Sequence, residues 1–524
     1  MRARFSSAGS VASFLIIIAL IYAPAAAGLA PGLAPGRIWG VLSQGFIMRA
    51  LVFSLTQAFI SSALATLLGG AAAVALTTVP GKWASVIRAL ALLSFMAPPM
   101  IVVSGFTALY GRGGLLSSLL PPLRVLGEGF SGIVAAHVFY NIPLAMNLVY
   151  STLVAVPPEL ADAVRIYSGG RAVPVIRKIV IPYALPAMAA SFTLTFIYCF
   201  SSFAIPLTIG GPKYSTLEVY IYYFYRTLFD YGAAAATAAV QFGVLAAATA
   251  AFALAYSRLP PPPVGRVAVS LLPGSRGVRL TSSVILVAVM TYLTLPLASV
   301  VIKSFEKPGD GLTVSGYERV FSPVPDPAIG VSGLRVVGNT LYFAVMTALI
   351  AVSVGSFLAF IGDWVADVLL TTLLAISPLT LATGLLNMYG RLVPAPLLIV
   401  FAHTTAALPL VIKSLRLGFL RVGREVAEAA RVLGARGLLY FMRVVVPLSR
   451  SAYFVAVALA VVVSLGEFGA TYLIARPEFY TLGIVIYSFR GVRDWPASYA
   501  AASVLLALSA SLLLVLSKRF ERWL

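Results

Sequence analysis

The chain has 524 residues, of which 60% are hydrophobic and only 10% are charged, and its formal net charge is +20 at pH 7. A soluble domain carries roughly a quarter charged residues, so this composition excludes an ordinary soluble protein and indicates a chain surrounded mostly by lipid. The positive charges lie in short stretches between apolar runs, which is typical of loops facing an anionic leaflet. We therefore expect membrane lipid as a partner and no nucleic acid.

The apolar windows are about 20 residues long, which is the length of helix that crosses roughly 30 Å of hydrocarbon. They do not alternate apolar and polar residues as the strands of a barrel would, so we expect helices. The first window resembles a signal peptide, but it is longer than the usual apolar region of about 7–15 residues, and we expect it to be a retained span. There are twelve windows, near 11–30, 51–78, 85–108, 131–155, 184–207, 233–256, 281–302, 337–361, 366–388, 393–412, 451–474 and 498–517.

The distribution of lysine and arginine predicts the orientation in the membrane. The two densest basic runs are Arg165–Lys178 and Lys413–Arg450, and both face the cytoplasm if the two termini do. We therefore predict a multi-pass protein of the plasma membrane with cytoplasmic N- and C-termini.

A segment rich in proline and arginine separates the two sets of six windows. It contains Pro260–Pro263, which cannot continue a helix and forms a semi-stiff spacer. We predict an all-α polytopic fold of about twelve transmembrane helices in two parallel six-helix halves, 1–256 and 281–524, joined by a cytoplasmic linker at 257–280.

The two halves repeat each other at an offset of 265 to 266 residues. The only histidines, His137 and His403, occupy equivalent positions, and Pro212…Thr216-Leu217…Ile221-Tyr222 matches Pro477…Thr481-Leu482…Ile486-Tyr487. Parallel repeats are related by an axis along the membrane normal, so the transport pathway is expected between the halves, on that axis.

One cytoplasmic segment with an unusual pattern occurs in both halves. The second copy contains Glu428-Ala429-Ala430, then Gly434 after three residues, then Val444-x-Val446-Pro447 after nine. The residues from Val422 to Leu433 are a good helix, Gly434 is placed to end it with a left-handed cap, and Pro447 is placed to break the short helix that follows. This helix–Gly–helix elbow between two spans is built to fit a partner's groove.

The first copy runs from Pro157 to Pro182 and departs from the pattern. Asp162-Ala163-Val164 replaces Glu-Ala-Ala, and one extra residue precedes Gly169.

Both elbows resemble the EAA loop of permease subunits of binding-protein-dependent ABC importers. In that family the loop forms the helices that dock onto the ATPase subunits. The resemblance covers nearly the whole chain, and fused two-half permeases of this length resemble the thiamine and iron(III) branch. Stretches such as Gly132–Leu144 and Cys199–Ala204 look most like thiamine permeases.

The resemblance implies the roles of particular residues and the partners. The first elbow lies at about 157–182 and the second at about 421–447. Two ATP-binding cassette subunits, expected to be a homodimer, would bind at the cytoplasmic face, and an extracytoplasmic binding protein would deliver the solute. The residues assigned to ATPase coupling are Glu159, Asp162, Ala163, Gly169, Pro182, Glu425, Glu428, Ala429, Ala430, Gly434 and Pro447.

The candidates for the pathway are polar or aromatic residues in or near the spans. A charge inside a span is a functional candidate because it is costly there, and Glu467, with Ser202 as its counterpart in the first half, could meet a cationic substrate. The alternative for Glu467 is an ion pair with Arg476 or Arg490. Tyr222 could stack on an aromatic ring, or it could belong to an interfacial aromatic belt.

The histidine pair leaves two interpretations open. His137 and His403 either pack and hydrogen-bond between helices or line the pathway. The sequence around them supplies no further ligands, so we expect no metal site.

The chain lacks the residues for ATP hydrolysis. Gly81-Lys82 is followed by Trp83 rather than Ser or Thr, so there is no phosphate-binding loop. We expect no catalytic residue and no cofactor bound by this chain, with ATP and Mg on the partner ATPase subunits. The resemblance implies the permease subunit of an ATP-driven importer, with thiamine as the expected substrate. The alternatives are iron(III) or another small solute, and an ion-coupled secondary transporter.

Overall fold

The computed structural model describes residues 17–520 except 168, 170, 259–270, 273, 308, 310, 362–372 and 436. The described residues form helices and two isolated β-bridges, Glu306 with Leu312 and Pro325 with Ser332. Eight described helices are long and apolar enough to cross a membrane, or ten if each of two bent helix pairs is counted as one span. The all-α polytopic fold is confirmed. The windows 11–30 and 366–388 lie partly outside the described residues.

The chain divides into two compact units. Unit 1 comprises 1–42, 220–242 and 304–524, and unit 2 comprises 43–219 and 243–303. Helices α12 (Leu217–Tyr222) and α13 (Tyr231–Tyr256) cross the boundaries between these ranges. The predicted division at 257–280 follows the order of the repeat along the chain, whereas the compact units combine segments from both halves.

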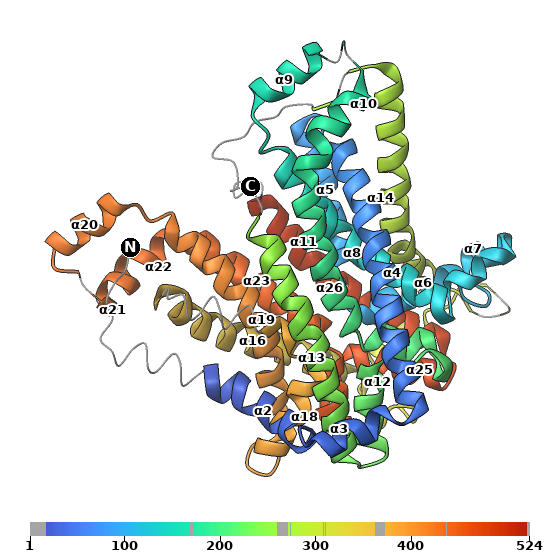
Figure 1. Cartoon of the computed structure of the whole chain (residues 1–524). Coiled ribbons are helices and arrows are strands. Elements are labelled where there is room, and N and C mark those ends of the chain that lie inside the picture. The colour runs from blue at the N-terminus through green and yellow to red at the C-terminus, as the bar shows by residue number, and fades with distance from the viewer. Residues whose placement is uncertain are drawn as a thin grey trace. The chain divides into compact units, whose positions relative to one another are not determined.

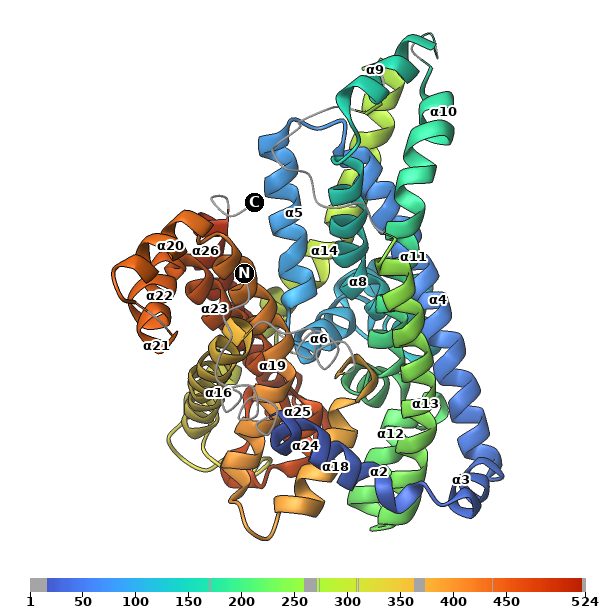
Figure 2. The ribbon, with the colours of Figure 1, turned by 60° about the vertical axis from the view of Figure 1, so that its left-hand side comes forward.

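Unit 2 is built around the long helices α4, α8, α11 and α14, which Figures 1 and 2 show side by side. Its elements are α4 (Gly45–Leu76), α5 (Gly81–Met96), α6 (Pro99–Tyr110), α7 (Leu115–Leu119), η3 (Pro121–Leu126), α8 (Gly129–Leu153), α9 (Pro158–Tyr167), α10 (Ala172–Val175), η4 (Ile176–Val180), α11 (Ile181–Phe200), η5 (Pro206–Gly210), η6 (Pro212–Tyr214) and α14 (Arg276–Ser304).

Unit 1 has a corresponding core of α16, α19 and α23. Its elements are η1 (Ile18–Tyr22), α2 (Ala23–Leu29), η2 (Ala30–Gly32), α3 (Pro35–Leu42), η7 (Tyr223–Thr227), α15 (Ser315–Val320), α16 (Gly333–Ile361), η8 (Leu373–Ala375), α18 (Pro378–Tyr389), α19 (Ala395–Leu420), α20 (Arg424–Val432), α21 (Gly437–Tyr440), η9 (Phe441–Val445), α22 (Val446–Leu448), α23 (Arg450–Gly466), α24 (Gly469–Ile474), η10 (Pro477–Phe479), α25 (Leu482–Gly491) and α26 (Trp495–Phe520).

The first helix of the second half, α14, packs within unit 2 against elements of the first half. The Ser94 hydroxyl donates to the Leu293 carbonyl at 3.0 Å, and the Tyr292 hydroxyl donates to the Ala135 carbonyl at 2.7 Å. A side chain at Gly105 would meet the Pro296 carbonyl oxygen at 2.5 Å, so the two backbones touch there. Glycine is required at this crossing because any β-carbon would separate the helices.

The first helix of the first half makes the reciprocal contact within unit 1. Helix α2 packs against α18, and side chains at Gly28 and Gly384 would collide with the backbones of Thr380 and Pro24 respectively. Each half therefore contributes its first helix to the unit that holds most of the other half.

Three predicted spans are interrupted, and each interruption has a local cause. The window 85–108 is two helices, because Pro98 and Pro99 follow the extended Ala97 and the axis of α5 and the helical segment after it bends by 98°. The windows 184–207 and 451–474 were predicted as continuous helices, which is wrong. The first helix ends at Phe200 and the second at Gly466, each followed by a short non-helical link.

Candidate functional site

The second elbow begins with α20, and its end is fixed by a Schellman motif. Gly434 has φ of +82°, its N–H bonds to the Arg431 carbonyl at 3.1 Å, and the Ala435 N–H bonds to the Ala430 carbonyl at 2.8 Å. This pair of bonds satisfies two carbonyls that the helix end leaves open. The left-handed cap predicted at Gly434 is present.

The chain then returns through α21, the π-turn η9 and α22. Pro447 lies at the second position of α22, and the helix continues to Leu448 before bending by 82° at Ser449. The break expected at Pro447 therefore falls two residues later. The wide turn η9 directly before Pro447 makes room for a ring that would otherwise clash with the preceding turn.

The first elbow has the same plan with one difference. Helix α9 is followed by Gly169, which has φ of +58° and whose N–H bonds to the Ile166 carbonyl at 3.2 Å. The π-turn η4 precedes Pro182 just as η9 precedes Pro447. However, the helix from Ala172 to Phe200 is not bent sharply at this point.

Both elbows expose a pair of large apolar side chains at the end of their first helix. Ile166 and Tyr167 are 82% and 76% exposed, and Val432 and Leu433 are 87% and 86% exposed. The two pairs are equivalent in the repeat, three and four residues after the central Ala of each motif. Isolated apolar side chains are common on surfaces, but two equivalent pairs on projecting elbows (Figures 1 and 2) form matched knobs.

The residues predicted to couple to the ATPase lie on these elbows. Ala430 is buried, and Gly169 and Gly434 are exposed at the helix ends. The other predicted residues are also exposed, and they are Glu159, Asp162, Ala163, Pro182, Glu425, Glu428, Ala429 and Pro447. Their carboxylates and small side chains are therefore available to a partner.

His403 is buried between three helical segments of unit 1, and both of its ring nitrogens are hydrogen-bonded. Nε2 lies 2.7 Å from the Thr471 hydroxyl, and Nδ1 lies 2.7 Å from the Ser464 hydroxyl. Because Thr471 donates its own proton to the Glu467 carbonyl, it accepts one from Nε2. This histidine is therefore the Nε2–H tautomer.

His137 is equally buried in unit 2, but it is the other tautomer. Its Nδ1 lies 2.9 Å from Gln57 Oε1, and the Gln57 amide donates to the Cys199 carbonyl at 2.8 Å. The Asn141 amide donates to the Cys199 sulfur at 3.6 Å. The Nε2 atom of His137 has no hydrogen-bond partner among the described residues. These contacts favour an interhelical role for both histidines.

Ser202 and Glu467 both lie in the helix breaks that the sequence did not predict. Ser202 lies in the link after α11, and the Thr216 hydroxyl donates to its carbonyl at 3.4 Å. Glu467 lies between α23 and α24, and one of its carboxylate oxygens accepts the Ala470 N–H at 2.9 Å. Glu467 thus stabilises the N-terminus of α24. Broken helices at equivalent positions are typical of substrate pathways.

Tyr222 belongs to an aromatic cluster in unit 1. Its ring stacks on Tyr472 with centroids 5.1 Å apart, and Tyr472 stacks on Phe468 at 5.2 Å. Tyr487 meets Tyr472 edge to face at 5.3 Å. No pattern in the sequence distinguishes Tyr472 from the other tyrosines. Tyr487 could have been selected, because it is the repeat counterpart of Tyr222.

A second polar residue that sequence reasoning missed is Glu218. Its side chain is fully buried in α12. The signal available was a single carboxylate inside an otherwise apolar stretch, which is a functional candidate by default.

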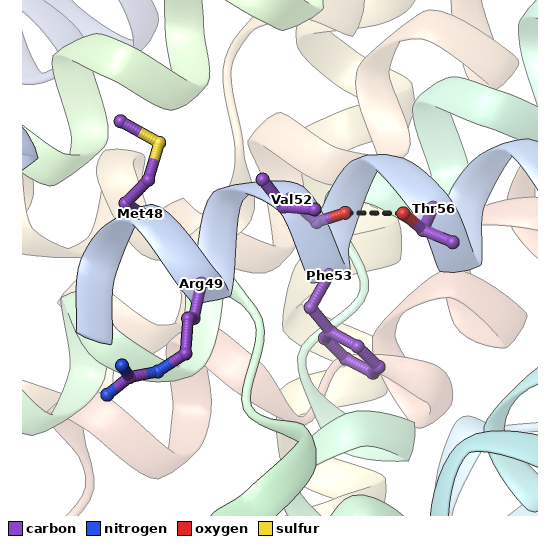
Figure 3. Close-up of a pocket in the computed structure, with 5 residues that line it drawn as sticks. All are labelled: Met48, Arg49, Val52, Phe53 and Thr56. Atoms are coloured by element: carbon purple, nitrogen blue, oxygen red, sulfur yellow. Dashed lines mark hydrogen bonds between the residues drawn. The ribbon is translucent and has the colours of Figure 1, made fainter. Parts of the chain in front are cut away.

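A shallow groove lies along the first turns of α4. It has a volume of about 320 Å³ and is lined by Met48, Arg49, Val52, Phe53 and Thr56. Figure 3 shows the Thr56 hydroxyl directed at the Val52 carbonyl, to which it donates at 2.7 Å, and Phe53 extending from the helix. The groove holds no acid or histidine, so it offers no site for proton transfer.

Comparison with known proteins gives consistent matches. Residues 65–258 match the family described as the inner membrane component of binding-protein-dependent transport systems. The thiamine transport system permease protein ThiP of Haemophilus influenzae is 26% identical over 90% of this chain and 88% of its own length. ThiP of Escherichia coli K12 is 26% identical over 91% of this chain and 90% of its own. The ferric transport system permease protein FbpB of Actinobacillus pleuropneumoniae is 26% identical over 35% of this chain and 27% of its own.

The apolar helices, the two elbows and the broken spans define a polytopic membrane protein, and the matches place it among transport permeases rather than enzymes. With the matches above, the chain is a fused two-half permease subunit of the binding-protein-dependent ABC importers. Proteins of this class span the plasma membrane several times and work with an ATPase and a solute-binding protein.

Proposed function

We propose that this permease moves thiamine into the cell. The observation that carries this proposal is the sequence identity of 26–27% with permeases named for thiamine transport, which extends over 85–91% of the chain. The similarity includes both elbows and both sets of spans, so it concerns the whole permease.

Two ATPase subunits, one on each elbow, would drive the transport. The support is the equivalent form of the two elbows, each with a left-handed glycine and an exposed apolar pair. Equivalent knobs on the two halves suit two identical partners, since a two-fold partner presents the same groove twice. ATP and Mg would be bound by those subunits.

The elbows also define the orientation that we propose. They carry the densest basic runs, Arg165–Lys178 and Lys413–Arg450, so they would face the cytoplasm with both chain termini. The binding protein would then deliver its solute to the opposite face. Closure of the ATPase subunits on ATP would bring the elbows together and open the pathway outward, and hydrolysis would reset it.

The second candidate substrate is iron(III). It is favoured by the similarity to the ferric permease, although this covers only 35% of the chain. The same fold and the same coupling to ATPase subunits would transport either one, so the two proposals differ only in the substrate.

The deciding experiment is uptake into proteoliposomes that contain the chain with its ATPase and binding protein. ATP is enclosed inside the liposomes, on the side of the membrane that the elbows face. Labelled thiamine and labelled iron(III) are offered separately. We expect ATP-dependent uptake of thiamine. Uptake of iron(III) but not of thiamine would identify iron(III) as the substrate. Uptake driven by an ion gradient without ATP would contradict the coupling proposal.

A further inference from the structure

We propose that Tyr222, Tyr472 and Tyr487 form a transit site for a planar organic cation. This inference rests on the proposed function and names residues that would contact its substrate inside the membrane. The observations that carry it are the composition of the cluster, its place in the repeat and its position beside a broken span.

The cluster combines equivalent residues of the two halves. Tyr222 and Tyr487 occupy matching positions in the repeat, and both contact the ring of Tyr472, at 5.1 and 5.3 Å. The two equivalent rings therefore lie within about 10 Å of each other. Tyr472 contacts both rings, so the cluster joins equivalent residues of the two halves within unit 1.

The cluster differs from an interfacial belt. In a belt, tyrosines sit at headgroup level with one end of each ring in water. Here the rings are packed on one another, and Phe468, which stacks on Tyr472 at 5.2 Å, is only 3% exposed. Tyr222, Tyr472 and Tyr487 are half-buried, so part of each ring remains available to a ligand.

The chemistry of the rings selects a cation with a flat face. Tyrosine rings attract a positive charge through their electron-rich faces, and they stack on planar aromatic ligands. Glu467 directly precedes Phe468 and adds a carboxylate to the same broken segment. A thiazolium ring combines the flat face and the positive charge that this arrangement favours.

The origin of the rings suggests how the site opens. Tyr222 comes from the first half of the sequence and Tyr472 from the second. At 5.1 Å the two rings contact each other directly and leave no space for a third between them. The two rings belong to different helices of the same unit, α12 and α24, so a small shift of one helix against the other would part them and admit a planar ligand.

The test uses the permease with its ATPase subunits in lipid nanodiscs, without the binding protein. Equilibrium dialysis measures the binding of labelled thiamine and of labelled N-methylthiazolium, with and without ATP and vanadate. Tyr472→Leu is the main variant, because Leu207 is the residue at the equivalent position of the first half. We expect it to weaken binding of both ligands about tenfold.

Two further variants separate the ring from its surroundings. Tyr472→Phe keeps the ring and should bind within roughly threefold of the wild type. Tyr231→Ala removes a tyrosine of the same unit that is 49% exposed and lies outside the cluster, and it should bind normally. Equal binding by wild type and Tyr472→Leu, or no binding of either ligand to the wild type, would overturn the site.

The site and the proposed function can fail separately. Thiamine uptake by wild type that Tyr472→Leu leaves unchanged would overturn the site and leave the function standing. Absence of thiamine uptake, together with tyrosine-dependent binding of N-methylthiazolium, would overturn the substrate and support the site for another organic cation.

Discussion

Gly434 is a residue whose role can be isolated, because only its backbone conformation restricts it. Its φ is +82°, and a β-carbon placed there would meet no atom within 4 Å. Gly434→Ala should therefore act through left-handed strain alone, about 1–2 kcal/mol, and loosen the end of α20. We expect ATP-dependent uptake to fall several-fold while the amount of folded permease stays the same.

The matched control is Gly434→Asn, because asparagine adopts the left-handed conformation more readily than alanine. It should retain most of the uptake. The same pair of changes at Gly169, where φ is +58°, should have a smaller effect, since the first elbow departs further from the family pattern. If both alanine variants transported normally, the docking role of the elbows would be wrong.

The hydrogen bonds of His403 give a second prediction at the residue scale. Thr471→Val keeps the shape of the side chain but leaves Nε2 without its 2.7 Å partner. An unsatisfied buried donor costs about 1–3 kcal/mol, so the purified permease should unfold at a lower temperature. Thr405→Val is the control, because its hydroxyl donates to the Phe401 carbonyl of its own helix at 2.8 Å. Equal melting temperatures of the two variants would contradict this assignment.

At the scale of elements, hydropathy predicted most helices and missed the places where they break. The windows 51–78, 131–155 and 233–256 correspond to α4, α8 and α13 within a few residues. The break at Pro98-Pro99 could have been read from the two prolines. The break at Glu467 could not, because its signal in the sequence is Gly466, and glycine is common inside transmembrane helices. Local hydrogen bonds of Glu467 and the tertiary bond of Thr471 to His403 stabilise it.

The crossing of α6 with α14 predicts a specific sensitivity to small side chains. Gly105→Ala would place a methyl group 2.5 Å from the Pro296 carbonyl oxygen, so the helices must separate. We expect a loss of roughly 1–3 kcal/mol in stability, measured as a lower yield and melting temperature of the purified chain. Gly243→Ala, whose methyl would meet nothing within 4 Å, should be neutral or slightly stabilising. Equal behaviour of the two variants would refute the close crossing.

The segment between α14 and α16 contains an ion-pair cluster that should respond to pH. Arg319 donates to both carboxylate oxygens of Asp326, at 2.6 and 2.8 Å, and also pairs with Asp494. These hydrogen bonds hold the pKa of Asp326 below its ordinary value, although burial opposes the shift. A lowered pKa in the folded state stabilises the fold above the unfolded pKa of about 3.9, and this contribution is lost as the pH falls through the folded value.

Asp326→Asn should therefore lower the melting temperature at pH 7 by an amount that corresponds to about 1 kcal/mol. The difference from wild type should shrink as the pH falls below about 4, where the wild-type carboxyl also becomes neutral. Glu318→Gln, an exposed acid on α15, is the control and should show little difference at either pH. A deficit of Asp326→Asn that is independent of pH would contradict the assignment of this stability to the carboxylate charge.

At the scale of the whole molecule, the repeat was visible in the sequence but the exchange of first helices was not. The pairs His137 with His403 and Pro182 with Pro447 reveal two halves of similar structure. Nothing in them shows that α14 packs beside Gly105 or that α2 packs beside Gly384, since apolar spans of similar composition can pack against many partners. The glycines at these crossings are visible in the sequence, but their role in close helix packing can be recognised only once the neighbouring helices are known.

The two elbows allow a test of whether the transporter needs both halves equally. Replacing Val432 and Leu433 by aspartate would put two charges where a partner's apolar groove is expected. Replacing Ile166 and Tyr167 by aspartate would do the same at the first elbow. All four side chains are exposed. Exposed positions tolerate such changes with little loss of folding, whereas burying an unpaired charge at an interface costs several kcal/mol. Each double variant should therefore fold but lose most of its ATPase in pull-down from detergent. If one ATPase subunit remained bound at the unchanged elbow, uptake should still fail, because alternating access requires both halves to move. Full ATPase binding and full uptake by either variant would show that this elbow is not a docking site.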